Sequence, residues 1–245
     1  MEQEHSITYA EFHILRCQAT LFTPDEEVSG AKIARGLLSS WSKRFDADPF
    51  IIPQLDRMPR EVPRIVLKNH TEDWNCEISS ERITIAWRRP KVEVAVPSLN
   101  QFYSEAITML VEYVDFLKTR VGRIGAVVIR YAAHPAPGKF LSKHFCKEDW
   151  LVKPLNRPEG FELHAHKRFE LSNEFLVNSW VRNKSGFVFT ADNGGKPAVL
   201  VEQDLNTLSE EVDKCDYTST NLESFFLAAA REFDIILGLY YPTGD

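Results

Sequence analysis

Two histidines separated by one residue, His164 and His166, are the side chains in this sequence whose spacing best suits chemistry. They lie in residues 161–171, where apolar and polar residues alternate, and residues i and i+2 of a strand project from the same face. Two imidazoles at this spacing can bind one metal ion, so one hypothesis is the metal site of a metal-dependent hydrolase or nuclease. The further ligands of such a site would be drawn from Glu162, Glu170, His134 and His144.

The same strand supports a second hypothesis, in which its polar side chains form a solvated surface that binds another protein. Glu162 and Arg168 share the polar face with the two histidines, and such a face is typical of a strand with one side in water. Trp180 lies off the apolar face of the strand that follows. Because exposed aromatic side chains often anchor protein partners, Trp180 is assigned to this surface as well.

Two further groupings could bind small ligands. Arg130 and Tyr131 end an apolar segment and, together with His134, predict an anion site beside a Pro-Gly loop; the structural alternative is an arginine in a salt bridge at the rim of a sheet. Glu202 and Asp204 share one strand face, as the paired carboxylates of nucleases and hydrolases can. No third acid or lysine stands at a spacing that would complete such a site.

The sequence contains no motif that predicts a cofactor. Its glycines form neither a dinucleotide-binding nor a phosphate-binding loop, and its serines lack the context of a nucleophile elbow. The four cysteines are widely spaced without a CxxC pair, which indicates reduced thiols rather than a zinc knuckle or a redox motif. They are Cys17, Cys76, Cys146 and Cys215.

Composition narrows the function classes further. The 245 residues carry a net charge of -6, and this acidic balance argues against a broad nucleic-acid footprint, although Trp87-Arg88-Arg89-Pro90-Lys91 is a small basic candidate. No apolar run approaches the roughly 20 residues that span a bilayer. The acidic, polar start of the sequence lacks the features of a signal peptide, so we expect a cytoplasmic protein without a membrane partner.

The expected order of secondary-structure elements occurs twice. Residues 7–22 predict a strand, 27–45 a helix, and 99–120 a long helix with one apolar stripe. Residues 124–131 and 220–240 predict a second opening strand and a second closing helix. The strands expected between them are 64–69, 73–79 and 82–88 in the first half and 161–171, 175–182, 186–191 and 198–205 in the second.

Residues 123–131, with the sequence Arg-Ile-Gly-Ala-Val-Val-Ile-Arg-Tyr, follow the first long helix. This segment resembles the LGLRYIN strand of a sporadically distributed, uncharacterised bacterial family of similar length, with Ala132 where the family has Asn. Members of that family also open with a strand and close with an aromatic-rich amphipathic helix, which residues 225–241 match. The resemblance implies an α+β fold and a bacterial accessory protein of phage-defence or mobile-element neighbourhoods, and it supplies no catalytic residues.

These patterns predict an α+β fold with two similar βαβββα-type halves, residues 1–121 and 122–245, packed together as one unit. A mainly antiparallel, curved sheet would be covered on one face by the two long helices. The expected function is a non-catalytic cytoplasmic accessory protein that binds another protein, with the metal-dependent hydrolase or nuclease as the alternative. We expect the binding surface to lie on the sheet face opposite the helices.

Overall fold

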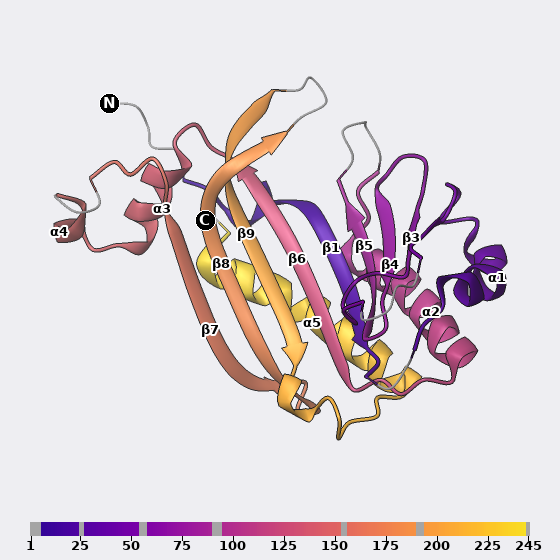
Figure 1. Ribbon diagram of the computed structural model, residues 1–245. Coiled ribbons are helices and arrows are strands. Elements are labelled where there is room, and N and C mark those ends of the chain that lie inside the picture. The colour runs from indigo at the N-terminus through magenta and orange to yellow at the C-terminus, as the bar shows by residue number, and fades with distance from the viewer. Residues whose placement is uncertain are drawn as a thin grey trace.

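The computed structural model describes residues 6–24, 27–53, 58–89, 95–152, 156–189 and 194–243. The strands in these ranges are β1 (His13–Phe22), β2 (Phe50–Ile51), β3 (Ile65–Lys68), β4 (Trp74–Ile78), β5 (Arg82–Arg88), β6 (Arg123–Ala133), β7 (Glu162–Leu171), β8 (Phe175–Phe189) and β9 (Gly195–Thr207). They form one antiparallel sheet in the order β2-β3-β4-β5-β1-β6-β9-β8-β7 (Figure 1). The helices are α1 (Gly30–Trp41), α2 (Leu99–Leu117), α3 (Pro137–Phe145), α4 (Glu148–Leu151) and α5 (Ser219–Tyr240), with 3-10 turns at Tyr9–Glu11 and Ser209–Glu211.

The two long helices, α2 and α5, begin at reciprocal caps. The Ser98 hydroxyl accepts from the Gln101 backbone N–H at 3.2 Å, and the Gln101 side chain accepts from the Ser98 backbone N–H at 2.9 Å. Thr218 and Asn221 repeat this arrangement at the start of α5. Each cap satisfies N–H groups that the first helical turn leaves unpaired, which fixes where the helix starts.

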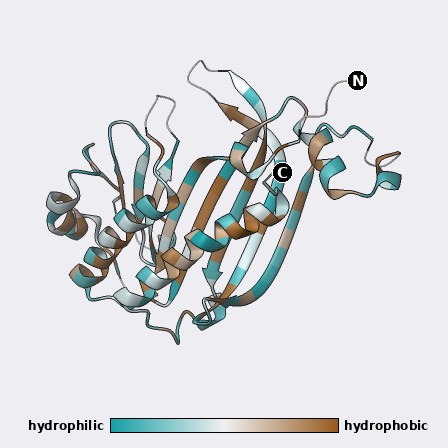
Figure 2. Ribbon diagram, turned by 180° about the vertical axis from the view of Figure 1, so that it is seen from behind, coloured by the Kyte–Doolittle hydropathy of each residue, from teal (hydrophilic) through white to brown (hydrophobic). Residues whose placement is uncertain are grey.

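Both helices lie on the same face of the sheet, as the apolar stripes predict (Figures 1 and 2). Leu110 of α2 and Phe226 of α5 are fully buried beneath them. Tyr103 stacks on Phe226 with ring centroids 5.2 Å apart, which joins the two helices directly. The main hydrophobic core therefore lies between one sheet face and this helix pair, and α1 adds Ile33, Leu37 and Trp41 to it.

The centre of the sheet is the pair β1 and β6. Cys17 lies opposite Val128, and the register shifts between Ile14 and Arg16. This pairing joins the strands that precede the junction near residue 121 to those that follow it, so the sheet is continuous across the chain midpoint. It remains open at its two edges, which are β2 and β7.

Several boundaries differ from the sequence prediction. The strands expected at 175–182 and 186–191 form one strand, β8, up to Phe189, and residues 190–193 lie outside the described ranges. A Cβ on Gly186 would lie 2.7 Å from Leu200, so this glycine permits close packing against β9 rather than a turn. The opening strand begins at His13 rather than at residue 7, because Thr8 and Glu11 cap a 3-10 turn.

Candidate functional site

The sheet has one face without any of the described helices, which we call the open face (Figures 1 and 2). On β7, Lys167 reaches Glu232 of α5, with 3.9 Å between Nζ and Oε1, so the odd-numbered residues of this strand project toward the helices. The even-numbered residues project from the open face and are exposed. They include four of the predicted surface residues, Glu162, His164, His166 and Arg168.

A stacked pair of rings forms the middle of this surface. His166 lies directly opposite Trp180 of β8, with ring centroids 4.2 Å apart and an interplanar angle of 21°. Asn178 accepts from Arg168 Nε at 3.1 Å, and its Oδ1 lies 3.3 Å from His166 Nε2. Arg168 also pairs with Glu210 at 2.9 Å. The stacked His166 and Trp180 rings thus lie beside a network of Asn178, Arg168 and Glu210 on the open face.

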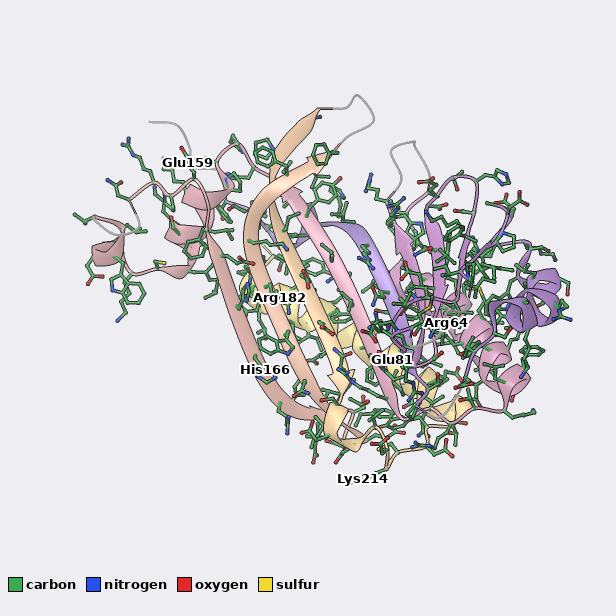
Figure 3. The ribbon with its side chains drawn as sticks, viewed as in Figure 1. Arg64, Glu81, Glu159, His166, Arg182 and Lys214 are labelled. Carbon is green, nitrogen blue, oxygen red and sulfur yellow. The ribbon has the colours of Figure 1, made fainter. Side chains whose placement is uncertain are left out.

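A second row of charged residues runs across the same strands. His164 Nε2 lies 2.7 Å from Glu162 Oε1, and this hydrogen bond lowers the pKa of the Glu162 carboxyl. Arg182 of β8 lies opposite His164 and pairs with Glu202 of β9. Lys184 lies 3.6 Å from Glu202 as well. Figure 3 shows His166 and Arg182 on the neighbouring strands β7 and β8. The row alternates acidic and basic groups, so neither sign of charge dominates it.

Asp204 lies two residues along β9 from Glu202, opposite Trp180. The predicted pairing of Glu202 and Asp204 on one strand face is therefore correct. Their environments differ, because Glu202 is bound by Arg182 and Lys184 whereas Asp204 accepts from Asn206. Burial raises the pKa of the Asp204 carboxyl above its usual range. The two carboxylates thus have separate partners.

Arg130 lies on the opposite side of the sheet from the other predicted surface residues. Its side chain is buried, with 2.6 Å between Nη2 and Oδ1 of Asp234 on α5, and it donates to Gln203 at 2.5 Å. Tyr131 projects from the open face, 5.6 Å from the ring of His13. The predicted anion site of Arg130, Tyr131 and His134 therefore does not form, and Arg130 instead ties α5 to the sheet.

The other histidines named as metal ligands have structural partners elsewhere. His134 Nδ1 accepts from the Ala136 backbone N–H at 3.1 Å, and the His144 ring stacks on Tyr241 with centroids 5.1 Å apart. Neither joins His164 and His166. Among the residues that the structure describes, no group of three or more His, Cys, Asp or Glu side chains is placed to hold a metal ion.

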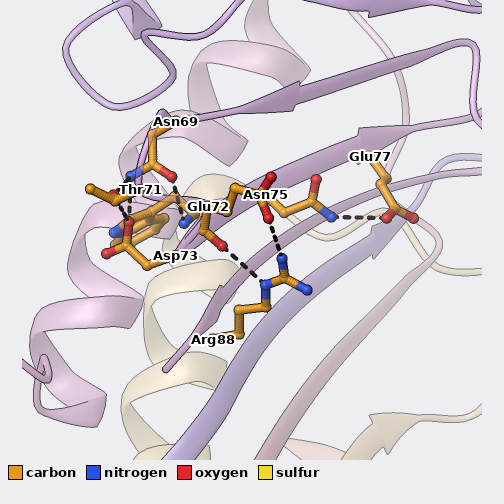
Figure 4. Close-up of polar contacts among 8 residues, drawn as sticks. Asn69, Thr71, Glu72, Asp73, Asn75, Glu77 and Arg88 are labelled. Carbon is orange, nitrogen blue, oxygen red and sulfur yellow. Dashed lines mark hydrogen bonds and ion pairs between the residues drawn. The ribbon is translucent and has the colours of Figure 1, made fainter. Parts of the chain in front are cut away.

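The described residues of the small basic segment at 87–91, which are 87–89, have separate partners. Trp87 is buried and donates to Asp73 at 3.2 Å, and Arg88 pairs with Glu72 at 3.0 Å (Figure 4). Arg89 lies over the Tyr131 ring at 5.9 Å. The last two residues of the segment, Pro90 and Lys91, lie outside the described ranges.

The sequence-based list omitted three residues that complete the surface, Asn178, Arg182 and Lys184. All three lie two or four positions from Trp180 on β8 and therefore share its face. The alternation that singled out Trp180 could have identified them. What sequence could not supply is the antiparallel register that sets Arg182 beside Glu202.

A cleft of about 540 Å³ lies near the far edge of the sheet and is lined by residues that include Phe50, Lys68, His70 and Glu77. His70 lies 3.0 Å from Asp46, and both side chains are exposed. None of the predicted site residues lines this cleft, so it is separate from the surface around Trp180.

No described helix is both long and apolar enough to cross a membrane. A scan against models of protein families found no match for this chain, and a search of curated proteins found none either.

Proposed function

We propose that this protein is a non-catalytic cytoplasmic accessory protein that binds another protein through the open face of β6, β9, β8 and β7. The observation that carries this proposal is the exposed Trp180 ring, stacked on His166 in the middle of a strand surface that none of the described helices covers. Tryptophan and arginine are the residues most enriched where protein interfaces gain their binding energy. Here Arg168 and Arg182 flank the tryptophan.

The charges of this surface favour a protein over a nucleic acid. A nucleic-acid footprint needs a cluster of basic side chains that neutralise phosphates. On the open face, Arg182 is balanced by Glu202 and Arg168 by Glu210, and the whole chain carries a net charge of -6. A partner with its own mixture of donors, acceptors and charges matches this pattern better.

The cellular setting that we propose rests on the sequence resemblance at residues 123–131. That resemblance is to a bacterial family, and the accessory role would then belong to a phage-defence or mobile-element system. A pull-down from the native host, read alongside the neighbouring genes, tests this part of the proposal.

We also propose that residues 1–121 and 122–245 are two like-shaped halves that arose by duplication. In support, β1 and β6 are neighbours at the centre of the sheet, and β5 and β9 lie next to them on either side. The closing helices α2 and α5 share one face of the sheet. The test is a superposition of the two halves, which should align these three pairs of elements with the same chain direction.

Site-specific crosslinking tests the proposed binding surface. A photoreactive phenylalanine analogue at Leu176 would project from the open face of β8, four residues from Trp180. The matched control is the same analogue at Leu239, an exposed leucine on α5. In extracts of the native host, we expect one discrete adduct from position 176 and none of that mass from position 239.

The adduct must also depend on the tryptophan. Trp180→Ala should remove the product formed from position 176, because the proposed anchor is lost. Equal adducts from both positions, or an adduct that is unchanged by Trp180→Ala, would contradict the assignment of the open face.

A further inference from the structure

The two edges of the sheet differ greatly in length. At one edge, β2 is two residues long, whereas β7 at the other edge is ten residues long. Among the described residues, β7 pairs with β8 and with no strand on its other side. A long edge strand presents unpaired N–H and C=O groups to which another strand can add.

The phase of the β7–β8 ladder identifies those backbone groups. The Ser185 N–H donates to the Phe161 carbonyl at 2.9 Å, and these two residues lie opposite each other in the extended register. Hydrogen-bonded and non-hydrogen-bonded pairs alternate along an antiparallel ladder, so the odd-numbered residues of β7 bond to β8. The backbone groups of His164, His166 and Arg168 therefore point to the free edge.

We propose that β7 pairs with β7 of a second copy of this chain, antiparallel and about a twofold axis at Ala165. In this register Glu162 lies opposite Arg168 of the second copy, and the twofold axis repeats this pair of opposite charges. His164 lies opposite His166 of the second copy. All of these residues have backbone groups at the free edge, so the facing pairs exchange N–H···O=C bonds.

Charge favours this register over those in which the axis lies nearer the C-terminal end of β7. A twofold axis normal to the sheet places the open faces of both copies on the same side. The possible registers therefore differ only in which residue of β7 lies on the axis. With the axis at His166, Glu162 would oppose Glu170 of the second copy. With the axis at Lys167, this lysine would lie directly opposite Lys167 of the second copy. Like charges directly opposite each other destabilise a strand pair.

The helix side of the strand fits the same pairing. With the axis at Ala165, Phe161 lies opposite Phe169 of the second copy, and both side chains are half-buried. Lys167 also projects to this side, where it lies 3.9 Å from Glu232 of its own chain and would face the uncharged Leu163 of the second copy.

The chain around α4 supports an interface on this side. In Figures 1 and 2, α3 and α4 extend past the free edge of β7. Trp150 at 51% exposure and Val152 at 69% lie in or just after α4. Two large apolar side chains are thus exposed on the side of the molecule where the second copy would bind. This inference concerns self-association and does not depend on the proposed function.

A charge swap tests the inference. The purified chain should form a dimer of twice 28.1 kDa at high micromolar concentration in analytical ultracentrifugation. Glu162→Arg and Arg168→Glu should each raise the dimer dissociation constant at least about tenfold, because each change places two like-charge pairs in the interface. The double variant Glu162→Arg/Arg168→Glu restores opposite charges and should recover the dimer. Glu223→Arg, on the exposed side of α5, should have no effect.

Hydrogen exchange provides an independent readout on the unaltered chain. The amides of His164 and His166 should exchange slowly at high protein concentration and fast on dilution. A wild-type chain that stays monomeric, a dimer that both single variants retain, or a double variant that remains monomeric would overturn the proposal.

Discussion

The residue type of Arg130 does not indicate on which face of the sheet its side chain lies or which residue it binds. An arginine beside a tyrosine at the end of an apolar segment has the composition of an anion site, but neighbouring residues of a strand project from opposite faces. Arg130 therefore lies beneath α5 with Asp234, while Tyr131 lies on the open face. The anion-site hypothesis overlooked this alternation, which places the two side chains on opposite faces of β6. The identity of the partner on α5 depended on the tertiary fold.

The buried ion pair should respond unequally to the loss of each partner. Asp234→Ala leaves the Arg130 guanidinium buried without its carboxylate, which typically costs about 3–5 kcal/mol. Arg130→Met leaves Asp234 half-exposed to water and should cost less. Urea unfolding of both variants measures the difference. Equal costs, or a smaller cost for Asp234→Ala, would contradict the assigned role of Arg130.

Asp204 should make the folded protein less stable as the pH rises. An acid in a salt bridge has the opposite effect, because its pKa is lowered in the folded state. Its pKa is raised in the folded protein because burial disfavours the charged carboxylate. The folded state thus binds the proton more tightly, and the stability present at low pH is lost as pH rises through the raised pKa. Asp204→Asn should therefore stabilise the protein at pH 7, and this gain should shrink as the pH falls through the raised pKa toward the ordinary carboxyl value of about 4. Thermal melts across this range check the prediction, and a destabilised variant at pH 7 would refute it.

At the scale of elements, the buried sides of long periodic segments could be predicted from the sequence. Short segments whose composition suggests a different structure could not. The stripes of α2 and α5 and the alternation of β7 fix which side of each element is buried, because burial requires that period. Lys184-Ser185-Gly186 has the composition of a turn, yet it continues β8. Gly186 accommodates Leu200 there, and Ser185 accepts from the Phe161 backbone N–H at 2.9 Å. Such contacts come from neighbouring strands and leave no local pattern.

The helix layer should depend on its central side chains. Leu110→Ala should cost about 2–5 kcal/mol and Phe226→Ala about 3–5 kcal/mol, since each would leave a cavity beneath a helix. Leu239→Ala is the matched control, because this side chain is 76% exposed. Denaturant midpoints near the wild-type value for the two core variants would show that the stripes are not packed as described.

At the scale of the whole molecule, the sheet is continuous from β2 to β7, and the two long helices α2 and α5 lie on one of its faces. The apolar stripes of the two long helices and the alternating residues of the strands predicted this layer arrangement, because each needs one buried side. The order of the strands within the sheet could not be predicted in the same way. The pairing of β1 with β6 at its centre depends on contacts between residues far apart in the sequence.

This continuity predicts that the molecule unfolds as one unit. Separating the halves would expose the paired edges of β1 and β6 and the contact between Tyr103 and Phe226. We therefore expect a single calorimetric transition whose calorimetric and van't Hoff enthalpies agree. Two resolved transitions would mean that residues 1–121 and 122–245 are independent domains.

We propose that the open face around Trp180 binds a protein partner. The most direct test of this proposal is titration calorimetry with the partner identified by crosslinking. We predict that Trp180→Ala weakens binding about 30-fold or more, as for an anchor worth about 2 kcal/mol, while Leu239→Ala leaves the affinity unchanged. Wild-type affinity in Trp180→Ala, together with lost binding in Leu239→Ala, would place the interface on the helix side and contradict the account.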